Sequence, residues 1–115
     1  MKMIITMIKP ERLEDVMAEL KNKEIRRITV FEVRGYGEQM GHTEVYRGQE
    51  FEVKLRPKVQ LEIACNDEFT ETICQAIEKG AKSPEGGAIG DGKIFVSNIE
   101  QAIRIRTGEE GVEAL

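Results

Sequence analysis

The chain has 115 residues, is 40% hydrophobic and 5% aromatic, and carries a formal net charge of -4 at pH 7. This length suits one domain with its own core, so a single domain is expected over residues 1–115. The acidic balance argues against direct nucleic-acid binding, which favours a basic surface. No apolar stretch approaches the roughly 20 residues of a membrane span, so no membrane insertion is expected. The cysteines, Cys65 and Cys74, lack metal-ligand spacing, which indicates reduced thiols and a cytoplasmic location.

The first part of the chain predicts a strand, a helix and a second strand. Met1–Ile8 is short and mostly apolar, which is typical of a buried strand. Pro10 suits the first turn of a helix, and apolar residues at helical spacing continue this helix to about Asn22. Ile25–Arg34 is rich in β-branched residues and predicts a second strand that ends at Gly35.

A long polar segment separates the two halves of the chain. Gly35–Phe51 contains four glycines and has no sustained period, so we expect a loop, placed at about residues 36–55. Loops of this length in compact domains are usually functional or disordered. The one histidine, His42, has no obvious catalytic partner, and Glu50 and Glu52 fit solvated carboxylates better than an acid–base pair. The sequence therefore does not predict an enzyme.

The second half resembles the first in plan. Apolar and polar residues alternate in Lys58–Cys65, which predicts a strand with Lys58 and Glu62 on its polar face. Asn66-Asp67-Glu68 offers N-cap oxygens to a second helix, and Gly80 supplies its C-terminal stop.

The last third of the chain is expected to contain a glycine-rich loop and two short strands. The loop covers about residues 81–93, and the strands cover Ile94–Val96 and Ala102–Arg106. Residues 107–115 form an acidic tail that we expect to be mobile. The resulting order of strands and helices predicts an α+β, ferredoxin-like (split βαβ) sandwich.

The residues Gly90-Asp91-Gly92-Lys93 are the first candidate binding site. Glycines allow a ligand close to the backbone, successive N–H groups can form an anion-binding nest, and Lys93 adds a positive charge. The spacing matches neither a Walker A motif nor a dinucleotide fingerprint. A tight turn with a solvated lysine is the alternative interpretation.

Two residue pairs are further candidates. Arg104 and Arg106 share one face of the predicted terminal strand and present guanidinium groups suited to phosphate, although they also fit ordinary charge on an edge strand. Gln39 has an amide oxygen that can ligate Mg²⁺, and Lys58 can pair with a carboxylate. Their spacing alone equally fits plain surface residues.

Along nearly its whole length the chain resembles the PII nitrogen-regulatory signal proteins. The resemblance is carried by short motifs that occur in a fixed order, with the long loop of residues 36–55 matching the family's T-loop. These motifs are Ile8-Lys9-Pro10, Gly35-Tyr36-Gly37, Gly41-His42-Thr43-Glu44, Tyr46-Arg47-Gly48, Pro57-Lys58-Val59, Gly90-Asp91-Gly92-Lys93-Ile94-Phe95-Val96 and Ile103-Arg104-Ile105-Arg106-Thr107-Gly108-Glu109-Glu110.

The resemblance implies a ferredoxin-like homotrimer with a nucleotide cleft between neighbouring subunits. ATP and ADP would compete for this cleft, and ATP with Mg²⁺ would allow 2-oxoglutarate to bind at the base of the T-loop. The T-loop would then engage or release a target protein, such as an ammonium transporter or an enzyme of nitrogen assimilation. The protein would act by binding and not by turnover, although slow ATP hydrolysis is a further alternative.

The resemblance also implies roles for individual residues. Gln39 would contact Mg²⁺, nucleotide and 2-oxoglutarate, and Lys58 would pair with a carboxylate of 2-oxoglutarate. The remaining nucleotide-binding positions would surround the base, the ribose and the phosphates, with the two arginines reaching across from the adjacent subunit: Thr29, Gly35, Gly37, Glu62, Gly90, Asp91, Gly92, Lys93, Arg104 and Arg106.

The sequence departs from the family pattern at several positions. Phe51 stands at the usual modified tyrosine and Gln49 at the phosphoserine position, so no covalent modification of the T-loop is expected. Glu38 and Met40 replace frequent basic residues. The alternative therefore stays open that the protein senses only ATP and ADP and has lost the response to 2-oxoglutarate. The longer segment Lys82–Gly87 leaves Ser83 as the candidate hydroxyl contact to the nucleotide.

Overall fold

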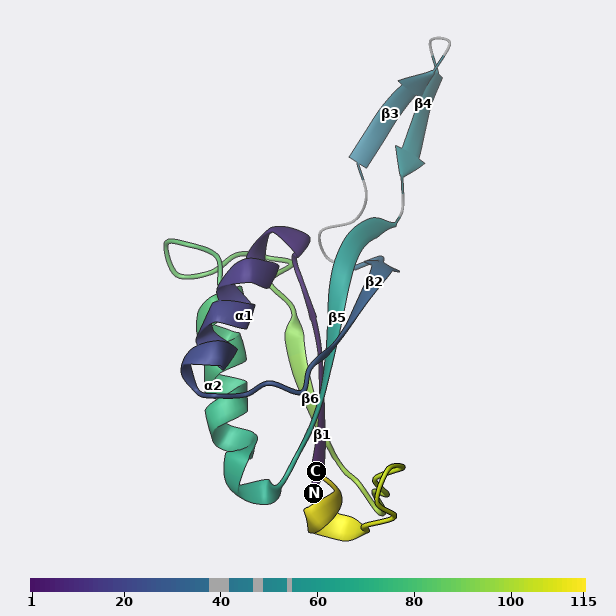
Figure 1. The fold of residues 1–115 in the computed structure, drawn as a ribbon. Helices are drawn as coiled ribbons and strands as arrows, with labels where there is room; N and C mark the ends of the chain where they lie inside the picture. Colours follow the sequence, from purple (N-terminus) through teal and green to yellow (C-terminus); the bar gives the residue numbers. More distant parts are fainter. Residues whose placement is uncertain (38–41, 47–48, 54) are drawn as a thin grey trace.

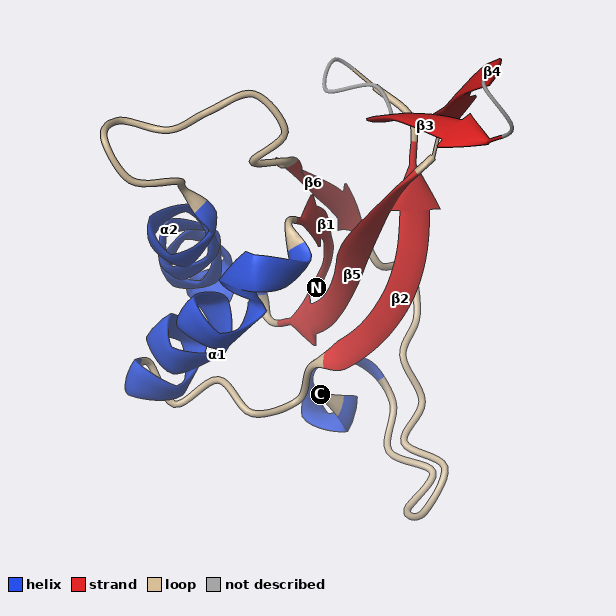
Figure 2. Cartoon of the chain, turned by 90° about the horizontal axis from the view of Figure 1, so that it is seen from above, coloured by secondary structure: helices blue, strands red, loops and turns tan. Residues whose placement is uncertain are grey.

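The computed structural model describes the chain except residues 38–41, 47–48 and 54. Four strands form one antiparallel sheet in the order β2-β5-β1-β6, and two helices cover one of its faces (Figures 1 and 2). This arrangement confirms the predicted α+β, ferredoxin-like fold. The elements are β1 (Lys2–Ile8), η1 (Pro10–Arg12), α1 (Leu13–Asn22), β2 (Thr29–Gly35), β3 (His42–Tyr46), β4 (Gln49–Val53), β5 (Arg56–Cys65), η2 (Asp67–Phe69), α2 (Thr70–Ala81), β6 (Lys93–Asn98) and η3 (Gly111–Ala114), where η marks a 3₁₀ helix.

The core lies between the sheet and the two helices. Every second residue is buried there from Ile4 to Ile8 in β1 and from Val59 to Cys65 in β5, and for β5 the alternation in the sequence predicts this. Thr6 is the polar member of this buried set, and its Oγ1 donates a hydrogen bond to the Lys93 carbonyl at 2.8 Å. The buried apolar side chains are Ile4, Ile8, Val16, Leu20, Val59, Leu61, Ile63, Cys65, Ile73, Ala76, Ile77 and Ala81.

Both predicted ends of the second helix need correction. Gly80 does not stop the helix but lies inside α2, where an added Cβ would come within 2.6 Å of the Val16 Cα. Its missing side chain therefore lets α1 and α2 pack closely. At the other end, Asn66 stands at the N-cap position of η2, but its side chain makes no capping hydrogen bond, and its Nδ2 donates to the Val112 carbonyl at 3.2 Å.

The second strand begins later than predicted. β2 starts at Thr29, whereas Ile25 still belongs to the turn after α1, with its N–H donating to the Leu20 carbonyl at 3.0 Å. Ile25 and Ile28 pack against the core without pairing in the sheet. Their apolar character therefore reflects burial, not strand structure.

The T-loop contains regular structure that the sequence did not predict. β3 and β4 pair antiparallel as a separate two-stranded sheet, with His42 opposite Val53 and Tyr46 opposite Gln49. This hairpin lies beyond the ends of β2 and β5 (Figure 1). Its strands are close in the chain and pair through the backbone, and such pairing does not require a hydrophobic alternation.

The predicted terminal strand is also wrong. Ala102–Arg106 leads into a turn that is closed by one bridge, between Ile103 and Glu110, and by a hydrogen bond from the Gly108 N–H to the Arg104 carbonyl at 2.7 Å. Ile105 is 98% exposed at this turn. The tail, which we expected to be mobile, ends in η3.

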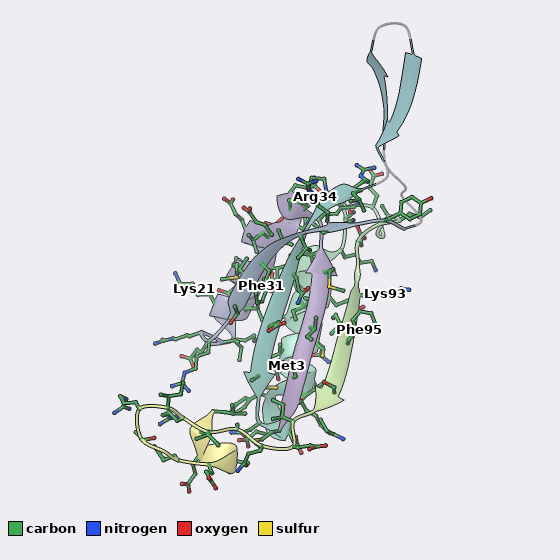
Figure 3. The ribbon with its side chains drawn as sticks, turned by 90° about the vertical axis from the view of Figure 1, so that its right-hand side faces the viewer. Met3, Lys21, Phe31, Arg34, Lys93 and Phe95 are labelled. Atoms are coloured by element: carbon green, nitrogen blue, oxygen red, sulfur yellow. The ribbon has the colours of Figure 1, made fainter. Side chains whose placement is uncertain are left out.

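The sheet face opposite the helices carries apolar side chains. Met3, Phe31 and Phe95 lie on this side, on three different strands (Figure 3). Phe31 is 41% exposed and Phe95 is 52% exposed. The alternation in β1 places Ile5 and Met7 on the same face. The chain therefore has one dry face of the sheet and one open, partly apolar face.

Candidate functional site

An open cleft of about 990 Å³ lies where β2 ends, β5 begins and the glycine-rich loop enters β6. The elements meet there because antiparallel pairing sets Gly35 opposite Arg56 and Met7 opposite Lys93. The cleft brings together most of the residues predicted to bind nucleotide phosphates and 2-oxoglutarate. From the predicted set it contains Gly35, Gly37, Lys58, Gly90, Asp91, Gly92 and Lys93.

The cleft is positively charged. Among the described residues, Arg34, Arg56, Lys58 and Lys93 line it, and Asp91 supplies the one carboxylate. The pKa of Lys58 is lowered, mainly by partial burial and to a smaller extent by the nearby cations Lys9 and Arg56. Bringing these cations together costs energy that a bound anion offsets.

Sequence reasoning missed Arg34 and Arg56 as site residues. They stand on the paired ends of β2 and β5, directly before and after the segment that leads to the T-loop. Basic residues flanking a long polar loop were the signal available in the sequence. Such flanking charges identify a binding site only once the pairing of the two strands is known, because the pairing is what brings them together.

The glycine-rich loop runs along the cleft with a backbone that suits glycine. Gly90 and Gly92 have φ angles of 95° and 109°, in the left-handed region. An added Cβ at Gly92 would lie 1.9 Å from the Met7 carbonyl oxygen, so no side chain fits between this loop and β1. Lys93 follows immediately as the first residue of β6 and is exposed. The predicted anion-binding segment thus adopts a fixed, close-packed turn at the cleft wall.

The carboxylate of Asp91 is engaged inside the loop. It accepts hydrogen bonds from the backbone N–H groups of Ser83 and Ala88, both at 2.9 Å, and from the Ser83 hydroxyl. Lys9 forms a salt bridge with it at 3.2 Å. Burial alone would raise the pKa of Asp91, but these hydrogen bonds hold it well below its usual range. The Ser83 hydroxyl, expected as a nucleotide contact, is used in this network.

Lys58 links β5 to the same loop. Its Nζ donates a hydrogen bond to the Gly90 carbonyl at 3.0 Å. The side chain predicted to hold a 2-oxoglutarate carboxylate therefore already contacts the segment predicted to hold phosphates. A ligand that attracts the Lys58 ammonium would compete with this hydrogen bond.

The rest of the predicted site lies elsewhere. Thr29 and Glu62 border a second hollow of about 420 Å³ together with Leu115, at the end of the sheet where the chain terminates. Arg104 and Arg106 lie on the C-terminal turn, where the Arg104 guanidinium pairs with Glu109 at 3.1 Å. A single chain therefore presents the predicted nucleotide residues in two separate groups.

Some residues of the predicted site fall outside the part of the chain that the structure describes. Gln39, Glu38 and Met40 lie outside the described residues, as do the side chains of Gln49 and Phe51. Within the described part of the chain, no group of three histidine, cysteine or carboxylate side chains is arranged to hold a metal ion. In that same part, neither helix has the length and apolar character needed to cross a membrane.

Comparison with known proteins identifies the family. A family model described as nitrogen regulatory protein P-II matches residues 1–109. Nitrogen regulatory protein GlnK1 of Methanosarcina mazei is 50% identical over the whole of this chain and 97% of that protein. Nitrogen regulatory protein P-II of Rhizobium meliloti is 49% identical over the full length of both chains.

A solved structure supports the same assignment. PII of Arabidopsis thaliana, in a crystal structure described as bound to citrate, superposes with a TM-score of 0.78 at 34% identity, covering 99% of this chain and 91% of that one. The predicted resemblance is thereby confirmed. The chain belongs to the P-II family of nitrogen regulatory signal proteins.

Proposed function

We propose that this protein binds ATP or ADP, with Mg²⁺ and 2-oxoglutarate, and uses its T-loop to regulate a target protein of nitrogen metabolism in the cytoplasm. The observation that carries the proposal is the cationic cleft formed by the Gly90–Lys93 turn and the ends of β2 and β5. Left-handed glycines and four cations suit the oxygens of a di- or triphosphate. The protein acts by binding and not by turnover.

The division of the predicted site supports a homotrimer. Two sets of predicted nucleotide residues lie at opposite ends of the sheet within one subunit, so a cleft between neighbouring subunits is the arrangement that unites them. The open sheet face, with Phe31 and Phe95 partly exposed, supplies an apolar surface for association. A closed threefold ring is an ordinary symmetry for such an assembly.

Lys58 is the proposed anchor for a 2-oxoglutarate carboxylate. It lines the cleft and carries its charge near the phosphate turn. The described citrate complex of the Arabidopsis relative supports a small carboxylate as ligand. Magnesium prefers octahedral oxygen ligation, which nucleotide phosphates, the Gln39 amide and a 2-oxo acid together supply.

Isothermal titration calorimetry tests the ligands directly. ATP and ADP are each titrated with and without Mg²⁺, and 2-oxoglutarate is titrated against the protein loaded with MgATP. We expect both nucleotides to bind and 2-oxoglutarate to bind only when MgATP is present. Nucleotide binding without any 2-oxoglutarate response would favour the alternative, a sensor of ATP and ADP alone. Absence of nucleotide binding would contradict both.

Mixed trimers test whether the site lies between subunits. Lys93→Ala and Arg106→Ala variants are prepared separately and then unfolded and refolded together. If one subunit supplies Lys93 and its neighbour supplies Arg106, some interfaces of a mixed trimer contain both native residues, and part of the tight ATP binding returns. If both residues serve a site within one chain, mixing restores nothing. Sedimentation of the mixture provides the control for trimer formation.

A further inference from the structure

The glycine-rich loop is held by a cluster of three side chains that contact one another and the loop backbone. The cluster consists of Lys9, Ser83 and Asp91. Lys9 follows β1, Ser83 follows α2, and Asp91 lies just before β6, so the cluster ties together three elements of the fold. Each side chain is largely withdrawn from solvent, with the Lys9 and Asp91 side chains 15% and 19% exposed.

Every member of the cluster contacts the other two. Lys9 Nζ lies 3.2 Å from Asp91 Oδ1 and donates to Ser83 Oγ, also at 3.2 Å. The Ser83 hydroxyl in turn donates to Asp91 Oδ1. Asp91 Oδ2 accepts the Ser83 and Ala88 backbone N–H groups, so one carboxylate fixes both the beginning and the middle of the loop.

The cluster also controls charge at the cleft. Asp91 is the one carboxylate among the described residues that line it. Unpaired, this carboxylate would repel phosphate oxygens at close range. The Lys9 ammonium compensates the negative charge of Asp91, although Lys9 itself does not line the cleft.

We propose that Lys9, Ser83 and Asp91 are positioning residues that hold the Gly90–Lys93 backbone in the shape that receives the β- and γ-phosphates of the nucleotide. This inference rests on the proposed nucleotide site and adds to it a way of distinguishing nucleotides by their number of phosphates. Because the cluster acts on the phosphate turn and not on the base, it separates ATP and ADP from AMP. A loop without it would keep its glycines but lose the fixed direction of its N–H groups.

The test measures affinities for ATP, ADP and AMP in variants of the full trimer. Lys9→Gln and Ser83→Ala remove cluster contacts, and Lys9→Arg and Ser83→Thr preserve the charge or the hydroxyl. Glu85→Gln is the matched control, because Glu85 is exposed on the same loop. Thermal unfolding of each variant verifies that it folds. Hydrogen exchange of the loop amides without ligand reports the loop's order directly.

We expect Lys9→Gln to weaken ATP and ADP by roughly tenfold, the effect of losing a hydrogen bond to a charged group. AMP affinity should stay near that of the native protein, exchange at residues 83–92 should accelerate, and Lys9→Arg should recover most of the ATP affinity. Glu85→Gln should match the native protein in all three affinities.

Three outcomes would overturn the inference. Native ATP affinity in both Lys9→Gln and Ser83→Ala would show that the cluster does not position the turn. An equal loss for ATP, ADP and AMP would indicate general damage to the fold. If the native protein bound no nucleotide, the proposed function would fail together with this inference, whereas either of the first two results leaves that function standing.

Discussion

Two loops of this protein carry left-handed glycines next to cationic residues, but they are held in different ways. In the glycine-rich loop, Asp91 gathers side-chain and backbone donors, and Gly92 presses against β1. In the C-terminal turn, backbone hydrogen bonds and the Arg104–Glu109 ion pair close the chain, and no described atom lies within 4 Å of a Cβ added at Gly108. The first loop is shaped by its own chain, while the second presents Arg106 outward. The difference is what the proposed site between subunits requires, with the turn preformed in one subunit and Arg106 supplied by another.

Substituting Gly92 should break the first loop. In Gly92→Ala the new methyl group would overlap the Met7 carbonyl, and alanine would also be strained at a φ of 109°. Left-handed strain of about 1–2 kcal/mol adds to overpacking of about 1–3 kcal/mol. We expect a loss of about 3 kcal/mol in the free energy of unfolding and no measurable ATP binding, tested by urea denaturation and calorimetry.

Gly108→Ala provides the matched control in the second loop. Gly108 has a φ of 74° and open space around it, so alanine should cost only the backbone strain of about 1–2 kcal/mol. If both glycine variants were equally destabilised, the proposed contrast between a packed and an open loop would be wrong.

Removing Lys58 should affect the two proposed ligands, ATP and 2-oxoglutarate, differently. We expect Lys58→Ala to abolish the 2-oxoglutarate response while ATP affinity stays close to native, because the remaining cations still line the cleft. Lys58→Gln is the sharper variant: its amide can still donate to the Gly90 carbonyl, but it has no charge for a carboxylate. Calorimetry with 2-oxoglutarate against the MgATP-loaded protein measures both. A variant that still responds would show that the carboxylate is held elsewhere.

Arg106 tests the second loop. Arg106→Ala should weaken ATP binding by roughly tenfold or more, because a hydrogen bond to a charged group contributes about 1.5–3 kcal/mol. The free energy of unfolding should change little, since the residue is exposed on the turn. Unchanged ATP affinity would remove Arg106 from the site, and a large loss of stability would assign it a structural role instead.

The sequence predicted the elements that bury a regular face. β5 alternates because one of its sides contacts the helices, and this burial is visible as a hydropathy period, whereas β1 was predicted from its short apolar run. The same reasoning failed at Ala102–Arg106, where isoleucine and arginine alternate in an exposed turn, so the alternation reflects no buried face. It failed at Gly80 because a glycine required for helix packing has the same appearance as a helix stop.

The candidate site was predictable in its residue types but not in its arrangement. The glycines and Lys93 predicted an anion-binding turn, and the structure brings them to one cleft with Lys58. The link from Lys9 to Asp91 joins residues from opposite ends of the chain, so no local pattern reveals it. The separation of Thr29 and Glu62 from the turn likewise depends on strand register, which a list of motif residues does not contain.

The smallest expected effect is the pH dependence of the first loop. Hydrogen bonds lower the pKa of Asp91 in the folded protein, so its contribution to stability is complete above the pKa of an unfolded aspartate, about 3.9, and is lost as pH falls through the lower folded value. Asp91→Asn should therefore lower Tm by a few degrees at pH 7 and equally at pH 5, with the difference from the native protein shrinking below about pH 4. Thermal unfolding of both proteins across this range measures it. A difference that already disappeared near pH 6 would mean that another group supplies the loop's stability, and the Asp91 network would then not be what holds the first loop.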